Sequence, residues 1–317
     1  MLKVYMVNKT IMIVGTGVLG SYLSKYFLRN KNKVYVTTRS LKKPKNNYKF
    51  HKIEKNVKFI KLNILKPKDI SKKINLIKPD LIYYFAGQSS IFLSYKKVKE
   101  TMNSNYYGAL NFLKIIHKEK LDIKFYKASS GYIFEKLYNK NKLFIKYIKP
   151  NNPYVESQIK AFKSVLKFRK LGIKCSSLIF FNIESPLKSK HFLLNKINDF
   201  IKFKKSKFLK LGNIDVARDF SWAPEIMQGV YYSSNLKSQD IIFGSGKIFY
   251  IKDMIKFFFE LKDMNYINFI KIDKSLYRKK ERIKLISSKS NTIKLLKKWK
   301  WSPKTYGKNL VSKLLNT

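Results

Sequence analysis

Cysteine is almost absent from this sequence of 317 residues, in which Cys175 stands alone. A single cysteine excludes a disulfide within the chain and is typical of a reducing compartment, so we expect a cytoplasmic protein. No apolar run approaches the roughly 20 residues that a membrane-spanning helix requires, and we therefore expect no membrane span. The N-terminal residues also lack the uninterrupted apolar segment and the small-residue cleavage site of a signal peptide.

Acidic residues and arginine are scarce as well. There are 19 Asp and Glu against 68 Lys and Arg, which gives a net charge of +49, and almost all of the cations are lysine. The lysines are dispersed through every segment, and no helix-turn-helix, zinc-finger or aromatic RNA-binding signature accompanies them. We therefore attribute the charge to the codon bias of an AT-rich genome and expect no specific nucleic-acid partner. A polyanion or an anionic membrane surface is the alternative partner.

The sequence does contain a glycine pattern near its start. A buried-strand run over 11–14 leads directly into Gly15-x-Gly17-x-x-Gly20, and an amphipathic helix with an apolar face follows. Gly15 allows a tight turn, Gly17 lets the backbone approach a pyrophosphate, and Gly20 lets helix and strand pack closely. Because the helix N-terminus adds free N–H groups and a positive dipole end, the pattern predicts a dinucleotide site.

The end of the next predicted strand indicates which dinucleotide is bound. Thr38 is followed by Arg39, where an acidic residue would accept hydrogen bonds from the ribose of NAD. Arginine suits the additional phosphate of NADP, and this chain otherwise uses arginine sparingly. We therefore expect NADP, with NAD as the alternative.

Short apolar strands alternate with helical patterns through the first half of the chain. This alternation predicts an α/β fold, namely a Rossmann-like, doubly wound parallel sheet with a smaller C-terminal substrate-binding lobe. Residues 1–185 would form the NADP-binding domain, and 186–317 would form mainly the lobe, with some segments returning to the first domain. Expected strands are 34–38, 57–62, 81–86, 123–128, 174–181, 208–211 and 241–243; expected helices are 18–30, 68–77, 98–118, one after Pro153, 191–203, 222–235, 251–262 and 289–299.

Two hydroxyl side chains could meet on one substrate. Ser130 ends a predicted strand, and Tyr154 begins the helix that follows. Tyrosine is a poor base at neutral pH unless a cation lowers its pKa, and position 158 lies one helical turn further on the same face. That position is glutamine. Tyr154 taken by itself is therefore an ordinary aromatic residue at a helix start.

Several longer blocks extend these observations. They include Ala86-Gly-Gln-Ser89, Phe125-Tyr-Lys-Ala-Ser-Ser130, Phe181-Asn-Ile-Glu-Ser-Pro186, Leu211-Gly-Asn-Ile-Asp215, Arg218-Asp-Phe220 and Tyr277-Arg-Lys-Lys-Glu281. Over about residues 10–310 the chain resembles the extended short-chain dehydrogenases/reductases of the NAD-dependent epimerase/dehydratase family. Within that family it is most similar to the GDP-mannose 4,6-dehydratases.

The resemblance implies a role for each matching position and a soluble enzyme acting on a GDP-linked hexose, without metal ligands. It also implies a homodimer or homotetramer. The implied cofactor contacts are Gly15, Gly17, Gly20, Arg39, Asn63, Phe85, Ala86, Gly87, Gln88, Ser89 and Lys188; the implied substrate contacts are Asn182, Lys196, Arg218, Arg278 and Glu281; and the catalytic positions are Ser130, Tyr132, Tyr154 and Gln158.

The family's reaction oxidises the hexose at C4, eliminates water across C5–C6 and returns the hydride to C6. Ser130 stands where the family has threonine and keeps the hydroxyl, whereas Tyr132 replaces the glutamate of the elimination step. Gln158 replaces the lysine beside the catalytic tyrosine. Two alternatives follow from these departures: a GDP-sugar 4-oxidoreductase or epimerase, or a catalytically silent protein that binds NADP or a nucleotide sugar.

Overall fold

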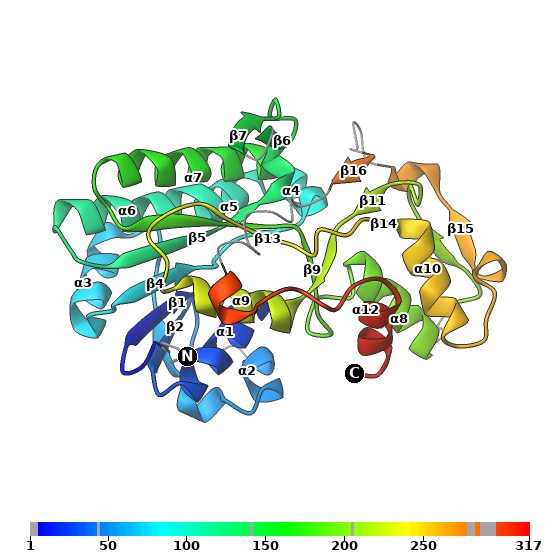
Figure 1. Cartoon of the computed structure of the whole chain (residues 1–317), viewed down its shortest axis with the longest axis horizontal. Coiled ribbons are helices and arrows are strands. Elements are labelled where there is room, and N and C mark those ends of the chain that lie inside the picture. The colour runs from blue at the N-terminus through cyan, green and yellow to red at the C-terminus, as the bar shows by residue number, and fades with distance from the viewer. Residues whose placement is uncertain (1–5, 43–44, 140–141, 204–205, 278–282, 286–295) are drawn as a thin grey trace.

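Seven parallel strands form the central sheet of the computed structural model, which describes residues 6–42, 45–139, 142–203, 206–277, 283–285 and 296–317. The strand order is β13-β8-β5-β4-β1-β2-β3 (Figure 1). Their bounds are β1 (Thr10–Val14), β2 (Lys33–Thr38), β3 (Lys58–Lys61), β4 (Leu81–Tyr84), β5 (Lys124–Ser130), β8 (Cys175–Phe180) and β13 (Ile241–Phe243). The order reverses beside β1, as in a doubly wound sheet, so the predicted fold class is confirmed.

Helices cover both faces of this sheet (Figure 1). Alternate side chains of β1 divide between the two faces: Ile11 and Ile13 belong to one apolar cluster, and Met12 and Val14 to the other. The first cluster lies against α1 (Val18–Arg29) and α9 (Ala223–Ser233). The second lies against α3 (Pro67–Ile77), α6 (Gly108–Lys118) and α7 (Pro153–Lys170). Strands buried on both faces explain the continuous apolar runs in the sequence.

The helix expected over 98–118 is divided into three parts. It consists of α5 (Val98–Met102), a π-helical turn η2 (Asn103–Tyr107) and α6. π-Turns occur mostly at functional sites, where they reposition a side chain. Here the turn contains Asn105, a fully buried side chain whose contacts are described below.

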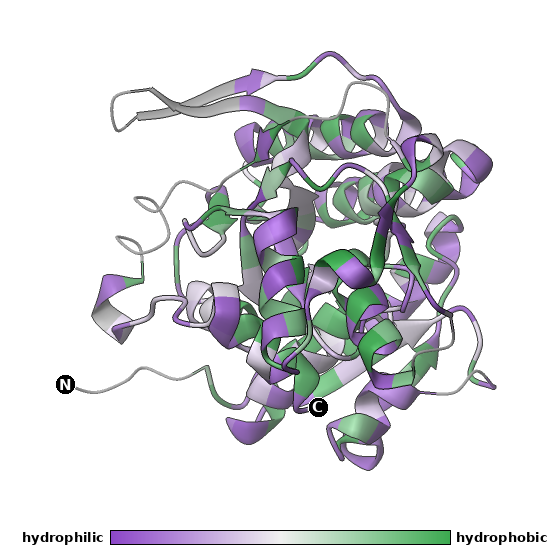
Figure 2. Cartoon of the chain, turned by 90° about the vertical axis from the view of Figure 1, so that its right-hand side faces the viewer, coloured by the Kyte–Doolittle hydropathy of each residue, from purple (hydrophilic) through white to green (hydrophobic). Residues whose placement is uncertain are grey.

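The C-terminal part forms a third apolar cluster, beside the sheet and on the right in Figure 1. It is built mainly from α8 (Leu193–Phe203), α10 (Ile251–Glu260) and α12 (Gly307–Leu315), whose buried apolar side chains pack together. Figure 2, which views this side of the molecule, shows helices that carry both hydrophobic and hydrophilic residues. Short strand pairs accompany them: β10 (Leu209–Leu211) with β15 (Ile270–Ile272), and β11 (Ala217–Arg218) with β14 (Phe249–Tyr250) and β16 (Lys284–Leu285). Segments α9 and β13 return to the sheet domain.

Several elements were not expected from the sequence. They are α2 (Asn46–Phe50), α4 (Ile91–Lys96), the hairpin of β6 (Phe134–Asn139) and β7 (Lys142–Tyr147), the pair of β9 (Asn182–Glu184) and β12 (Phe220–Trp222), the short strands β11, β14, β15 and β16, and the last helix, α12. Most of the helix expected over 289–299 lies outside the described residues, apart from a 3₁₀ turn at Lys297–Trp299. Among the described helices, none combines the length and the apolar composition needed to cross a membrane.

Candidate active site

The glycine turn after β1 has little room for larger residues. Gly15 adopts a φ of +109°, and a Cβ there would lie 3.0 Å from the backbone nitrogen of Ala86. At Gly20 a Cβ would lie 3.0 Å from Cγ2 of Ile13. Gly17 differs, because it is the N-cap of α1 and a Cβ there would enter open space. The turn thus packs tightly against the sheet while the helix N-terminus stays open, which fits a pyrophosphate.

The residues expected to contact the adenosine end of the cofactor lie at the ends of the next two strands. Arg39 directly follows β2 and is exposed. Asn63 follows β3 and is also exposed, and its side-chain oxygen accepts a hydrogen bond of 3.0 Å from the N–H of Leu65. Both residues follow strands at the carboxyl edge of the sheet, where ligands of such folds bind.

The loop from Phe85 to Ser89 is held between the glycine turn and two helices. Phe85 N–H donates to the Val14 carbonyl at 3.0 Å, which continues the β1–β4 pairing into the loop. The Asn105 side chain accepts from Gln88 N–H at 2.9 Å and donates to the Gln88 carbonyl at 3.0 Å. It also donates to Oγ of Ser157 in α7 at 3.0 Å. Asn105 therefore ties this loop to the helix of Tyr154, a role that no sequence pattern indicated.

Ser130, Tyr132 and Tyr154 come together where β5 ends and α7 begins. The Ser130 hydroxyl accepts from the N–H of Tyr132 at 3.2 Å. Burial raises the pKa of Tyr154 to about 12, and a hydrogen bond with Ser130 opposes that rise. At neutral pH Tyr154 is therefore protonated more completely than an exposed tyrosine, and a nearby cation would make its phenolate form more accessible.

Gln158 lies one turn after Tyr154 and is buried, with 7% of its surface exposed. Its side-chain oxygen has no hydrogen-bond partner among the described residues. A buried, unpaired amide oxygen costs stability, and a bound hydrogen-bond donor would remove that cost. The position expected to face the cofactor thus presents an acceptor with no protein donor.

Arg218 reaches from the C-terminal lobe to Tyr132. Its Nε donates to the Tyr132 hydroxyl at 3.1 Å, and its guanidinium carbon lies 5.8 Å from the centre of the ring. Its Nη1 also donates to the Ala217 carbonyl at 2.8 Å. Only 2% of Arg218 is exposed. The contact joins a residue expected to bind substrate to the residue at the family's glutamate position.

The other residues on the C-terminal side that were expected to contact cofactor or substrate instead bond to groups of the protein. Lys188 forms a 2.8 Å ion pair with Glu184, and its ammonium lies 4.4 Å from the centre of the Phe192 ring. Lys196 donates to the Lys210 carbonyl at 2.8 Å. Glu184 was not singled out from the sequence; it is 3% exposed, and one of its oxygens lacks a hydrogen-bond partner among the described residues.

Three further positions complete the expected set. Asn182 begins β9, and its N–H donates to the Asp219 carbonyl at 3.1 Å, which places it between sheet and lobe. Arg278 and Glu281 lie outside the described residues.

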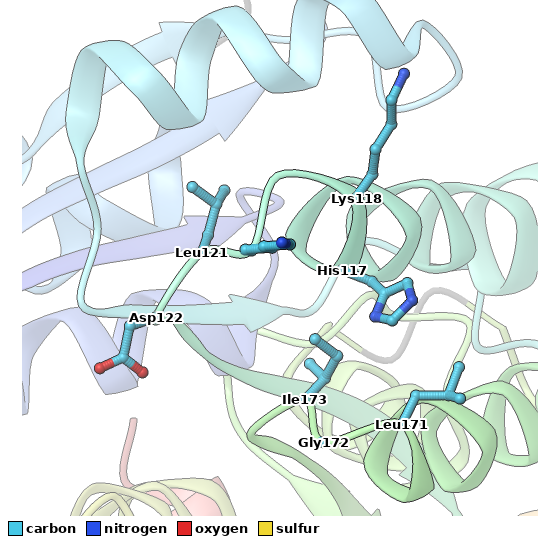
Figure 3. A pocket seen from close by; sticks show the side chains of 8 residues that line it. His117, Lys118, Leu121, Asp122, Leu171, Gly172 and Ile173 are labelled. Atoms are coloured by element: carbon cyan, nitrogen blue, oxygen red, sulfur yellow. The ribbon is translucent and has the colours of Figure 1, made fainter.

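A surface cavity of about 570 Å³ lies elsewhere, next to the ends of α6 and α7 (Figure 3). Its lining includes His117, Asp122 and Ile173, which precede β5 and β8 at the amino edge of the sheet. The glycine turn and Ser130 lie at the opposite edge. This cavity is therefore separate from the candidate active site.

Comparison with known proteins identifies the family. The model of the GDP-mannose 4,6 dehydratase family matches residues 12–314. The chain belongs to this family. Family members are nucleotide-sugar-modifying enzymes, and the assignment confirms the resemblance stated from the sequence motifs.

Individual relatives of the GDP-mannose 4,6-dehydratase family are distant in sequence. GDP-mannose 4,6 dehydratase 1 of Arabidopsis thaliana is 25% identical, covering 98% of this chain and 89% of its own length. The GDP-mannose 4,6-dehydratase of Sinorhizobium fredii is 26% identical over 61% of this chain and 58% of its own.

Solved structures share the fold. UDP-glucuronic acid 4-epimerase from Bacillus cereus, in complex with UDP-glucuronic acid and NAD, has a TM-score of 0.83 at 19% identity and covers 96% of this chain and 98% of that one. The dTDP-glucose 4,6-dehydratase from Bacillus anthracis, in complex with NAD, has a TM-score of 0.78 at 17% identity, with coverage of 98% and 97%. Within the GDP-mannose 4,6-dehydratase family, the described site departs from the expected pattern chiefly at Tyr132 and Gln158.

Proposed function

We propose that the chain binds NADP and a GDP-linked hexose and oxidises the hexose at C4 as the first step of a 4,6-dehydratase-type reaction. The observation that carries this proposal is the grouping of Ser130, Tyr132 and Tyr154 at the sheet edge that also holds the open glycine turn. When bound, the cofactor would accept the hydride from C4 and return it at C6. Every other step falls to side chains of this chain.

The protein's part in the oxidation is to receive a proton. Tyr154 would take the proton of the C4 hydroxyl while Ser130, hydrogen-bonded to it, orients the phenol. The glycine turn would hold the pyrophosphate, and Arg39 would bind the 2′-phosphate, a fit that favours NADP over NAD.

The elimination of water requires a group that removes the C5 proton and a group that protonates the leaving hydroxyl. Tyr132 stands where the family has the glutamate of this step, and its hydroxyl accepts a hydrogen bond from the Arg218 guanidinium. The guanidinium holds the phenol hydroxyl in place, so this pair offers a positioned hydroxyl where the family has a carboxylate. We assign to Tyr132 the role of acid and base in the elimination.

A second candidate is a 4-oxidoreductase or epimerase, which the same tyrosine favours because no carboxylate follows Ser130 in β5 and η3 (Gly131–Ile133). Purified protein is incubated with GDP-mannose and NADP, and the products are analysed by mass spectrometry. Loss of one water supports the dehydratase. Exchange of a C4 deuterium label into the cofactor without water loss selects the oxidoreductase. Binding of both ligands without either change refutes an enzymatic role.

A further inference from the structure

A buried lysine lies on the strand that carries Ser130. Lys127 occupies β5 three residues before Ser130 and is only 2% exposed. Among the described residues no carboxylate forms an ion pair with it. A buried ammonium without a counter-charge carries a large desolvation cost, which a bound ligand can offset.

The ammonium of Lys127 lies at the carboxyl edge of the sheet. Lys127 is paired with Tyr84, the last residue of β4, and its Nζ lies 5.7 Å from the centre of the Tyr84 ring. Nζ donates to the carbonyl of Ala128. In a parallel strand, the backbone groups of every second residue point toward the same neighbouring strand. Lys124 N–H bonds on the β4 side, so the Ala128 carbonyl, four residues later, also points toward β4, just beyond the end of that strand.

The Ala128 carbonyl therefore lies next to the loop that follows β4, which the glycine turn contacts. The loop begins at Phe85, and its Ala86 is the residue against which Gly15 packs. Two residues later, Gln88 is bound by Asn105, which in turn bonds to Ser157, the neighbour of Gln158. The ammonium is therefore enclosed by the elements expected to surround the nicotinamide half of the cofactor.

The surroundings of Lys127 are polar but uncharged. Lys127 is paired with Tyr84 on β4 and with Ser177 on β8. Helix α7, which carries Ser157, also packs against β5, and Ser157 Oγ accepts a hydrogen bond from Asn105 of η2. Burial alone lowers the pKa of Lys127 to about 7. A ligand that accepts a hydrogen bond from the ammonium would raise that pKa and keep the cation in place.

We propose that Lys127 supplies, from strand β5, the cation that position 158 lacks, and that its ammonium binds the nicotinamide-ribose side of NADP. The proposal rests on the proposed function, since it requires a nicotinamide cofactor at this edge. Gln158 would then contribute its unpaired oxygen as an acceptor for a ribose hydroxyl, while Lys127 donates.

The test measures NADP binding to nucleotide-free protein by isothermal titration calorimetry. Replacing Lys127 by methionine removes one charged hydrogen bond, so we expect NADP affinity to fall by about 10- to 100-fold. The matched control is Lys124→Met at the opposite end of the same strand, where Nζ donates to the Ser234 carbonyl at 3.2 Å. This control should bind NADP as the wild type does.

A compensating exchange separates a cofactor role from a structural one. The double variant Lys127→Gln/Gln158→Lys returns the cation to the helix and should recover NADP affinity to within about threefold of the wild type, whereas Lys127→Gln alone should not. Thermal unfolding confirms that each variant is folded. Equal NADP affinity of the wild type and Lys127→Met overturns the assignment of Lys127, while a wild type that binds no NADP overturns the proposed function itself.

Discussion

Replacing Lys127 by methionine should change how stability depends on pH. Below pH about 7 the folded and unfolded chains both carry the proton on this lysine, so the folded state bears the whole cost of the buried charge. Above pH about 7 the folded state loses the proton, while the unfolded state keeps it up to the usual lysine pKa of 10.5. The unfolded chain then binds more protons, and stability must rise with pH in this window.

The size of the effect follows from the two pKa values. A fall from 10.5 to about 7 corresponds to a gain of about 3 kcal/mol in the unfolding free energy of the wild type between about pH 6.5 and about pH 9.5. Methionine does not titrate, so the variant lacks this gain. The unfolding free energy of Lys127→Met should therefore exceed that of the wild type most at the lower pH, and this excess should shrink as the pH rises.

Urea denaturation of nucleotide-free protein, followed by circular dichroism at constant ionic strength, measures both free energies. Lys61→Met serves as the control, because Lys61 is an exposed residue at the end of β3. If the difference in unfolding free energy between the wild type and Lys127→Met stays constant within about 0.5 kcal/mol across the pH window, the burial of a charged lysine is refuted.

Three further perturbations test the rest of the site. Gly15→Ala should lower the unfolding free energy by about 1–3 kcal/mol, because alanine is strained at this φ and meets the backbone of the loop after β4, whereas Gly17→Ala should leave stability within about 0.5 kcal/mol; urea denaturation measures both. Arg39→Ser should weaken NADP binding by about tenfold or more and leave NAD binding unchanged, as calorimetry would show. Tyr132→Phe removes the acceptor of Arg218 and should cost about 1–3 kcal/mol in urea denaturation.

Each of these has an outcome that contradicts it. If Gly15→Ala and Gly17→Ala lowered the unfolding free energy equally, the close approach of Gly15 to the backbone of Ala86 would not be what requires glycine in this turn. Parallel weakening of NADP and NAD in Arg39→Ser would show a contact to the shared phosphates instead of the 2′-phosphate. For Tyr132, a double-mutant cycle with Arg218→Met that gives no coupling energy would dismiss the pair.

Local features of the site could be predicted from the sequence. The glycine turn depends on residues within one strand–turn–helix unit, so its pattern is visible in ten consecutive residues. Ser130 and Tyr154 were likewise placed by a strand end and a helix start, because parallel strands present their carboxyl ends at one edge. The doubly wound parallel sheet followed from the same alternation, but the sequence did not indicate that the strand expected over 241–243, β13, joins this sheet at its edge.

Features that depend on distant contacts could not be predicted. The Arg218–Tyr132 contact joins residues 86 positions apart, and Asn105 bonds to Gln88 and Ser157 through a π-turn that no periodicity reveals. Lys127 was hidden for a different reason. In a chain with 68 Lys and Arg, a single lysine is most simply interpreted as a solvated surface charge, and only the structure shows that Lys127 is buried.

The partners of the other cations support the assignment of Lys127. Lys188 is bound to Glu184, and Arg218 is bound to Tyr132, so each already neutralises or orients a group of the protein. Lys127 has only a backbone carbonyl of its own strand as hydrogen-bond acceptor among the described residues. An ammonium so placed gains more from a ribose hydroxyl than either of the paired cations would, since it breaks no ion pair to bind one.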